Sequence, residues 1–168
     1  AREARRQAEI KTRVLDFTDD LFRRMDPELH PNARQTSPLQ VLKQSAASIG
    51  TRFADDPAAE RAVRISIGNT LQGMGGFAES IEHLNRALAI EASPGDPWET
   101  TRIEANLITA TWRIGKLDEA LRNVQKLRAQ AVAAIAAGTP ARDNQGKDVL
   151  LALDALQANV LQQLGDSS

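Results

Sequence analysis

The chain has 168 residues with 21 basic and 22 acidic side chains, so its formal charge of −1 gives no overall field to recruit nucleic acid or an anionic membrane. It contains no cysteine, which excludes disulfides and thiolate metal or redox sites. Hydrophobic residues reach 42% but aromatic residues only 4%, a composition typical of closely packed helices.

Residues 2–25 predict one long amphipathic helix. Its expected buried side consists of Ile10, Val14, Leu15, Phe17, Thr18, Leu21 and Phe22. The first two turns are polar and mostly basic. They fit either a solvated helix end or a juxtamembrane helix, so residues 1–24 are assigned to a leading, juxtamembrane-like segment.

Three pairs of a capping residue and a proline predict helix starts, because the side-chain oxygen accepts from free amides and proline fits the first helical position. These pairs are Ser37-Pro38, Asp56-Pro57 and Asp96-Pro97. They follow a loop over residues 26–36, and the helices after them are expected over residues 37–54, 57–74 and 98–114. Further helices are expected over residues 77–91, 117–137 and 147–164.

A helix, a glycine turn and a second helix form a unit that recurs along the chain. The apolar spacing around Gly75 is repeated around Gly115 and, in its first half only, around Gly165. The glycines at 73, 75 and 76 follow a helix and lack a following GKS or GKT, so they predict a helix cap and turn, not a phosphate-binding loop. We expect the chain to be part of a longer protein because the third copy is incomplete.

The residues of the first unit resemble a tetratricopeptide repeat. The resemblance is carried by Ile67-Gly68, Leu71, Gly75, Phe77, Ser80-Ile81, Leu84, Ala87-Leu88 and Pro94. Arg64 stands where such repeats usually carry tryptophan. The resemblance implies an all-α fold of about seven helices, in antiparallel pairs stacked as a right-handed superhelix. The repeat domain would cover residues 25–168, with units at about 37–56, 57–92, 97–137 and, in part, 147–166.

A longer stretch, residues 5–127, is similar to the repeat region that follows the membrane span in bacterial Ser/Thr kinases. Its markers are a DLF segment at 20–22, a DP at 26–27 and a DDP turn at 55–57. Similar regions occur in membrane-anchored winged-helix transcription regulators. The likeness implies an extracytoplasmic sensor of a single-pass receptor, with a cytoplasmic location as the alternative. Membrane contact would then come only from a preceding segment.

No catalytic or metal-binding motif is recognisable, so we expect a non-enzyme without a cofactor. His30 lies in a loop, and His83 is expected on the outer part of its helix; neither has a partner at metal-binding spacing. The acidic pairs 19–20 and 55–56 are explained as a solvated helical turn and a helix start.

Binding is therefore the predicted activity. In an array of helix pairs the first helices line the concave face, where asparagine and glutamine can hold a peptide backbone. Tryptophan and arginine dominate binding hot spots, which favours Trp112 with Arg113 as the anchor, although Trp112 could instead fill space between repeats. The predicted binding residues are Asn69, Gln72, Arg102, Thr109, Trp112, Arg113, Asn159 and Gln162.

The leading hypothesis is a protein- or peptide-binding module of a bacterial signalling receptor. Two alternatives stay open, a homodimerisation scaffold and a small-ligand sensor with its pocket inside the superhelix. None of the three involves nucleic acid contacting this part of the protein.

Overall fold

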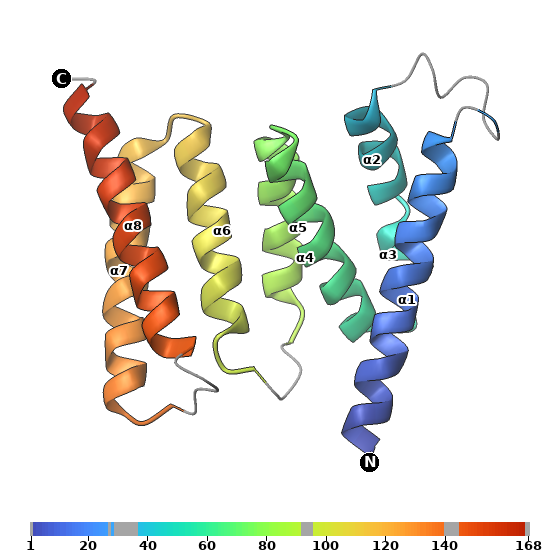
Figure 1. The fold of residues 1–168 in the computed structure, drawn as a ribbon, viewed down its shortest axis with the longest axis horizontal. Helices are drawn as coiled ribbons and strands as arrows, with labels where there is room; N and C mark the ends of the chain where they lie inside the picture. Colours follow the sequence, from blue (N-terminus) through green and yellow to red (C-terminus); the bar gives the residue numbers. More distant parts are fainter. Residues whose placement is uncertain (1, 27, 29–36, 92–95, 140–144, 167–168) are drawn as a thin grey trace. The chain divides into compact units, whose positions relative to one another are not determined.

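The computed structural model describes residues 2–26, 28, 37–91, 96–139 and 145–166. The described residues form eight helices and no strand (Figure 1). The helices are α1 (Arg2–Met25), α2 (Pro38–Ala46), α3 (Ile49–Arg52), α4 (Pro57–Gly73), α5 (Phe77–Ala89), α6 (Glu99–Arg113), α7 (Leu117–Ala136) and α8 (Gln145–Asp166). The all-α prediction is confirmed, whereas the stacking of pairs into a superhelix stays a prediction.

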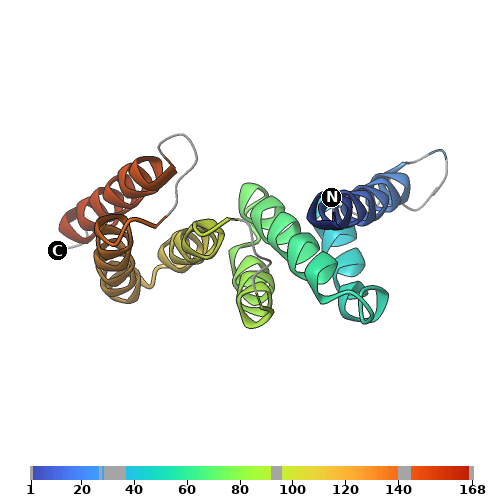
Figure 2. The ribbon, with the colours of Figure 1, turned by 90° about the horizontal axis from the view of Figure 1, so that it is seen from below.

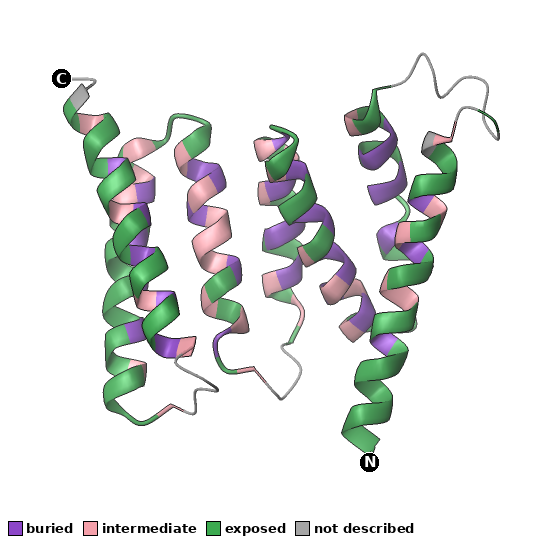
Figure 3. Ribbon diagram, in the orientation of Figure 1, coloured by how far each residue is buried: buried purple, intermediate pink, exposed green. Residues whose placement is uncertain are grey.

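The chain divides into two units, residues 1–91 and 92–168. In the first unit α4 contacts α1, α2, α3 and α5, so it is the central helix of that unit. Figure 3 shows many buried residues on α4, whereas most of α1 is exposed. The core joins Phe17 and Leu21 of α1 to Leu42 of α2 and to Val63 and Leu71 of α4.

Two residues of α1 that were expected in the core are exposed, Leu15 by 58% and Phe22 by 62%. At about 100° per residue, both lie roughly 140–160° around the helix from the buried Phe17. Only a narrow stripe containing Ile10, Phe17 and Leu21 meets the neighbouring helices. The prediction was wrong for Leu15 and Phe22 because it took apolar character alone as a sign of burial.

The predicted start of α2 is confirmed as a capping box. The Ser37 hydroxyl accepts from the Gln40 amide, and the Gln40 side chain accepts from the Ser37 amide. The single helix expected over residues 37–54 is wrong, because the chain turns between α2 and α3. There the Ser48 hydroxyl donates to the Ser45 carbonyl at 2.8 Å, and such side-chain bonds compete with regular helical bonding.

Helices α4 and α5 pack side by side, joined by the predicted glycine turn (Figures 1 and 2). Gly75 has a φ of 80°, which only glycine adopts readily, and the Gly76 amide donates to the Leu71 carbonyl at 2.8 Å. Gly68 lets the pair approach closely, since a Cβ there would lie 2.8 Å from Leu84 Cδ2. The turn prediction is confirmed.

The second unit repeats this arrangement in α6 and α7, with Gly115 at a φ of 85°. Helix α7 also packs on α8, as two views of the ribbon show (Figures 1 and 2). Trp98, just before α6, is buried and would lie 3.2 Å from a Cβ added at Gly146 of α8. This contact helps to join the start of α6 to the start of α8 in one core.

In the part of the chain that the structure describes, no helix is both long and apolar enough to cross a membrane.

Candidate functional site

The predicted binding residues are divided between the two units. Asn69 is exposed and Gln72 half-buried on α4 of the first unit. The remaining six lie on α6 and α8 of the second unit. Six of the eight predicted binding residues therefore lie within one unit.

Trp112 is the centre of the set on α6 and α8. Its indole Nε1 donates to Oε1 of Gln163 on α8, and its ring packs against the core of the second unit. The Arg113 guanidinium lies 5.6 Å from the ring centroid, within the range of a cation–π interaction. The indole is half-buried, so it joins two helices and still presents part of its surface. Trp112, Arg113 and Gln163 are called the Trp112 cluster below.

The other predicted residues stand at different distances from this cluster. Asn159 and Gln162 are exposed on α8, within about one turn of Gln163. The Thr109 hydroxyl is occupied inside α6, donating to the Ala105 carbonyl at 3.0 Å. Arg102 lies ten positions before Trp112, roughly 15 Å along the helix, and pairs with Asp96. Arg102 is therefore brought to the start of α6 and not to the cluster.

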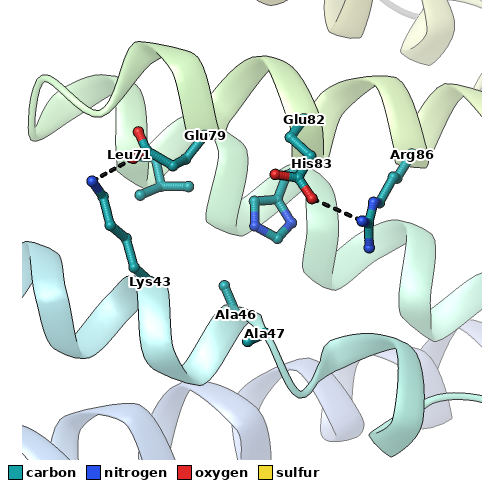
Figure 4. Close-up of a pocket in the computed structure, with 8 residues that line it drawn as sticks. All are labelled: Lys43, Ala46, Ala47, Leu71, Glu79, Glu82, His83 and Arg86. Atoms are coloured by element: carbon teal, nitrogen blue, oxygen red, sulfur yellow. Dashed lines mark ion pairs between the residues drawn. The ribbon is translucent and has the colours of Figure 1, made fainter.

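A pocket of about 310 Å³, which the sequence did not suggest, lies in the first unit between α2 and α5 (Figure 4). Its lining consists of Lys43, Ala46, Ala47, Leu71, Glu79, Glu82, His83 and Arg86. Figure 4 shows the His83 imidazole extending from α5 toward Ala46 and Ala47. We call this the His83 pocket.

Two ion pairs lie at opposite ends of the His83 pocket in Figure 4. Lys43 of α2 pairs with Glu79 of α5, and Arg86 pairs with Glu82 one turn before it at 2.8 Å. The hydrogen bond from Lys43 is the main cause that lowers the pKa of Glu79. Two acidic and two basic side chains therefore line the pocket.

His83 is buried, with 8% of its surface exposed, so its expected place on the outer part of the helix was wrong. It shares the buried side of α5 with Ser80, Leu84 and Ala87, a set at positions i, i+3, i+4 and i+7. That side faces α4, where the Arg64 guanidinium Nη1 lies 3.2 Å from His83 Nδ1. Burial, followed by the charge of Arg64, lowers the pKa of His83 below its ordinary value of 6.5.

Arg64 is held in place from its other side by Glu60. Its Nε and Nη2 each lie 2.7 Å from Glu60 Oε1, although Arg64 is only 2% exposed. A buried guanidinium is tolerable only when it is paired and hydrogen-bonded. Glu60, Arg64 and His83 therefore form one chain of polar contacts that ends in the pocket.

These buried charged groups were missed by sequence reasoning, which expected apolar residues in the core. One signal was present, because Arg61 and Arg64 fall on the same side of α4 as Ile67, Gly68 and Leu71. Arg61 has a structural task, since its Nη1 donates to the carbonyls of Ala87 and Ile90 at 2.6 and 2.9 Å near the end of α5.

In the described ranges no three histidine, cysteine, aspartate or glutamate side chains gather closely enough to hold a metal ion. His30 lies outside the described residues.

Comparison with known proteins found no family model, no curated protein and no solved structure that matches the chain.

Proposed function

We propose that the protein is a non-catalytic interaction module that binds a polypeptide segment through the exposed side of α6 and α8. The observation that carries this proposal is the Trp112 cluster, in which a half-buried indole is fixed by Gln163 and covered by Arg113. Aromatic anchors with little freedom lose little entropy on binding, and tryptophan and arginine are the residues most enriched in hot spots.

The neighbours of the cluster suit an extended peptide. Asn159 and Gln162 are exposed on α8, and their amides offer paired donors and acceptors that a peptide backbone can satisfy. In the first unit Asn69 and Gln72 carry the same amide chemistry.

The proposal is tested by selecting peptides from a random display library on the whole protein and measuring their affinity for variants. Asn159→Ala and Gln162→Ala change exposed residues, so they are expected to leave stability within about 0.5 kcal/mol and to weaken peptide binding. Trp112→Ala is expected to weaken binding at least about tenfold. Arg122→Ala, an exposed residue of α7, is the matched control and should bind like the wild type.

A purely packing role for Trp112 gives a different result. Trp112→Ala would then lower the free energy of unfolding, while Asn159→Ala and Gln162→Ala would bind every selected peptide as the wild type does. That outcome, or a library that yields no binding peptide, rejects the proposal.

A second candidate, self-association, has its own observation on α8. Leu151 is 71% exposed and Leu161 is also exposed, an apolar surface that a second copy could cover. Light scattering of the protein and of Leu151→Glu at high concentration decides it. A monomer in both cases rules it out, and a dimer that Leu151→Glu disrupts supports it.

The receptor context is proposed on the resemblance of residues 5–127 to the extracytoplasmic repeat region of bacterial Ser/Thr kinases and winged-helix regulators. The open reading frame from which the chain derives tests it directly. A membrane span joined to a kinase or winged-helix domain supports this context, and a frame with neither contradicts it.

A further inference from the structure

The imidazole of His83 offers a hydrogen-bond donor to the His83 pocket, and its contact with Arg64 shows which ring nitrogen carries the proton. An arginine side chain has only donors, so the 3.2 Å contact between Arg64 Nη1 and His83 Nδ1 requires Nδ1 to accept. A neutral imidazole with an accepting Nδ1 carries its proton on Nε2. Within the described residues, Arg64 is the one hydrogen-bond partner of His83.

The proton on Nε2 is directed to the pocket because His83 lines it and its other nitrogen is engaged on the α4 side. His83 is only 8% exposed, but Nε2 is not among the buried atoms that lack a partner in the described part of the chain, so this donor is open to the pocket. A ligand that places an oxygen acceptor next to Nε2 therefore gains a hydrogen bond that the protein alone does not make.

The charges around Nε2 define the rest of the ligand. A purely anionic ligand would face Glu79 and Glu82, whereas a purely cationic one would face Lys43, Arg86 and the Nε2 proton. A zwitterion meets an opposite charge with each of its groups and adds no net charge to the site. The charged lining thus favours a molecule that carries both signs.

The volume and the apolar part of the lining limit the size of the ligand. About 310 Å³ is at the small end of ligand pockets. Leu71, Ala46 and Ala47 offer a short aliphatic surface, which leaves room for a small side chain.

We propose that the His83 pocket binds a free amino acid as its zwitterion, with the carboxylate accepting from His83 Nε2 and the ammonium group held by Glu79 or Glu82. This site is made of other residues than the Trp112 cluster and does not depend on peptide binding there. It would give the protein a small-molecule input in its first unit.

The test is a titration of the whole protein with each of the twenty common amino acids, followed by analogues of any amino acid that binds. For valine the analogues are 3-methylbutanoate, which lacks the ammonium group, and isobutylamine, which lacks the carboxylate. Each analogue is expected to bind at least about tenfold more weakly than the amino acid, because each leaves charged or donor groups unmatched.

Variants separate the two halves of the recognition. His83→Asn keeps an oxygen that can accept from Arg64 and removes the donor at Nε2, so amino-acid binding should fall at least about tenfold. The double variant Glu79→Gln, Glu82→Gln should bind the amino acid more weakly than the wild type does. It should bind the analogue that has only the carboxylate with the same or higher affinity. Glu91→Gln removes an exposed carboxylate that does not line the pocket and serves as the control.

Nitrogen-15 spectra of the imidazoles give an independent readout, since the chain has only two histidines, His30 and His83. In the free protein the His83 signals should show the tautomer protonated at Nε2, and an added amino acid should shift them without shifting those of His30. The proposal is overturned if no amino acid binds, or if the analogue without an ammonium group binds as tightly as its amino acid. It is also overturned if His83→Asn binds amino acids as the wild type does, or if Nδ1 carries the proton.

Discussion

Gly68→Ala tests the close packing of α4 on α5. The added Cβ would lie 2.8 Å from Leu84 Cδ2 and 2.9 Å from Leu84 Cγ, distances that real Cβ contacts do not show. Leu84 is fully buried, and Cγ is its branch point and not a flexible end, so either the rotamer or the helix separation must change. Overpacking of this kind costs about 1–3 kcal/mol.

The same substitution also brings a gain that must be subtracted. Alanine is favoured over glycine inside a helix by up to about 1 kcal/mol, so the net loss from Gly68→Ala should be about 0–2 kcal/mol. Gly73→Ala supplies the correction, because Gly73 also belongs to α4 and nothing lies within 4 Å of its added Cβ. The difference in free energy of unfolding between the two variants should therefore be about 1–3 kcal/mol.

Urea unfolding followed by far-UV circular dichroism measures the free energy of unfolding of both variants. Their midpoints can be compared when this free energy falls with urea concentration at the same slope in both. A double variant with Leu84→Ala removes the obstructing side chain, so Gly68→Ala should cause no further loss in that background. The reasoning is refuted if Gly68→Ala is as stable as Gly73→Ala, since α4 and α5 would then have room that the structure does not give them.

Three further predictions concern buried polar groups in the first unit. Asp56→Ala should lower the free energy of unfolding by about 1–2 kcal/mol, because Asp56 caps α4 through the Ala59 amide and is paired with Arg6 and Arg13. In the same urea assay, Asp55→Ala at the exposed neighbouring position should change this free energy by less than about 0.5 kcal/mol. Ser80→Ala should raise it by about 1 kcal/mol, because the buried Ser80 hydroxyl has no hydrogen-bond partner in the described part of the chain; a loss in thermal or urea unfolding would show that the hydroxyl is satisfied in solution. The contribution of His83 to the free energy of unfolding should be fully present above pH 6.5 and should be lost as the pH falls toward the pKa of His83 in the folded protein. The reason is that this pKa is lower than the unfolded value, so the unfolded chain takes up the proton first. Unfolding at about pH 7.5 and about pH 5 should show this loss in the wild type and a smaller one in His83→Gln, and equal losses would contradict the assignment.

The features that the sequence predicted well are those decided within a few residues. The Ser37 capping box and the Asp56 cap depend on a side chain and an amide three positions later. Gly75 and Gly115 end their helices with positive φ, a conformation that glycine alone adopts without strain. Such signals survive because no tertiary contact is needed to produce them.

Burial on α1 and α5 was predicted less well because it depends on which side of a helix its neighbours occupy. Apolar character placed Leu15 and Phe22 in the core, yet α2 and α4 contact another side of α1. Polar character placed His83 outside, yet Arg64 of α4 supplies the contact that makes its burial possible. In both cases the deciding information lies in another helix.

In the candidate sites, too, the local contacts were predicted from the sequence and the contacts between helices were not. Trp112 and Arg113 were identified from their positions on one helix, and their stacking is a local contact. The bond from Trp112 to Gln163 spans 51 residues and could not be predicted from spacing on a single helix. The His83 pocket was missed altogether, since it needs Lys43 of α2 and Glu79 of α5 to meet.

The chemistry of the His83 pocket can be traced to one residue that does not line it. Arg64 lies on the buried side of α4, where an apolar residue would need no partner. A guanidinium there must be satisfied, and it engages Glu60 on its own helix and His83 Nδ1 on α5. Burial, followed by the charge of Arg64, lowers the pKa of the imidazole, and the contact with Arg64 selects its tautomer and leaves the Nε2 proton for the pocket. The arginine therefore serves packing and recognition together, because the bond that makes its own burial tolerable is also the bond that orients the donor.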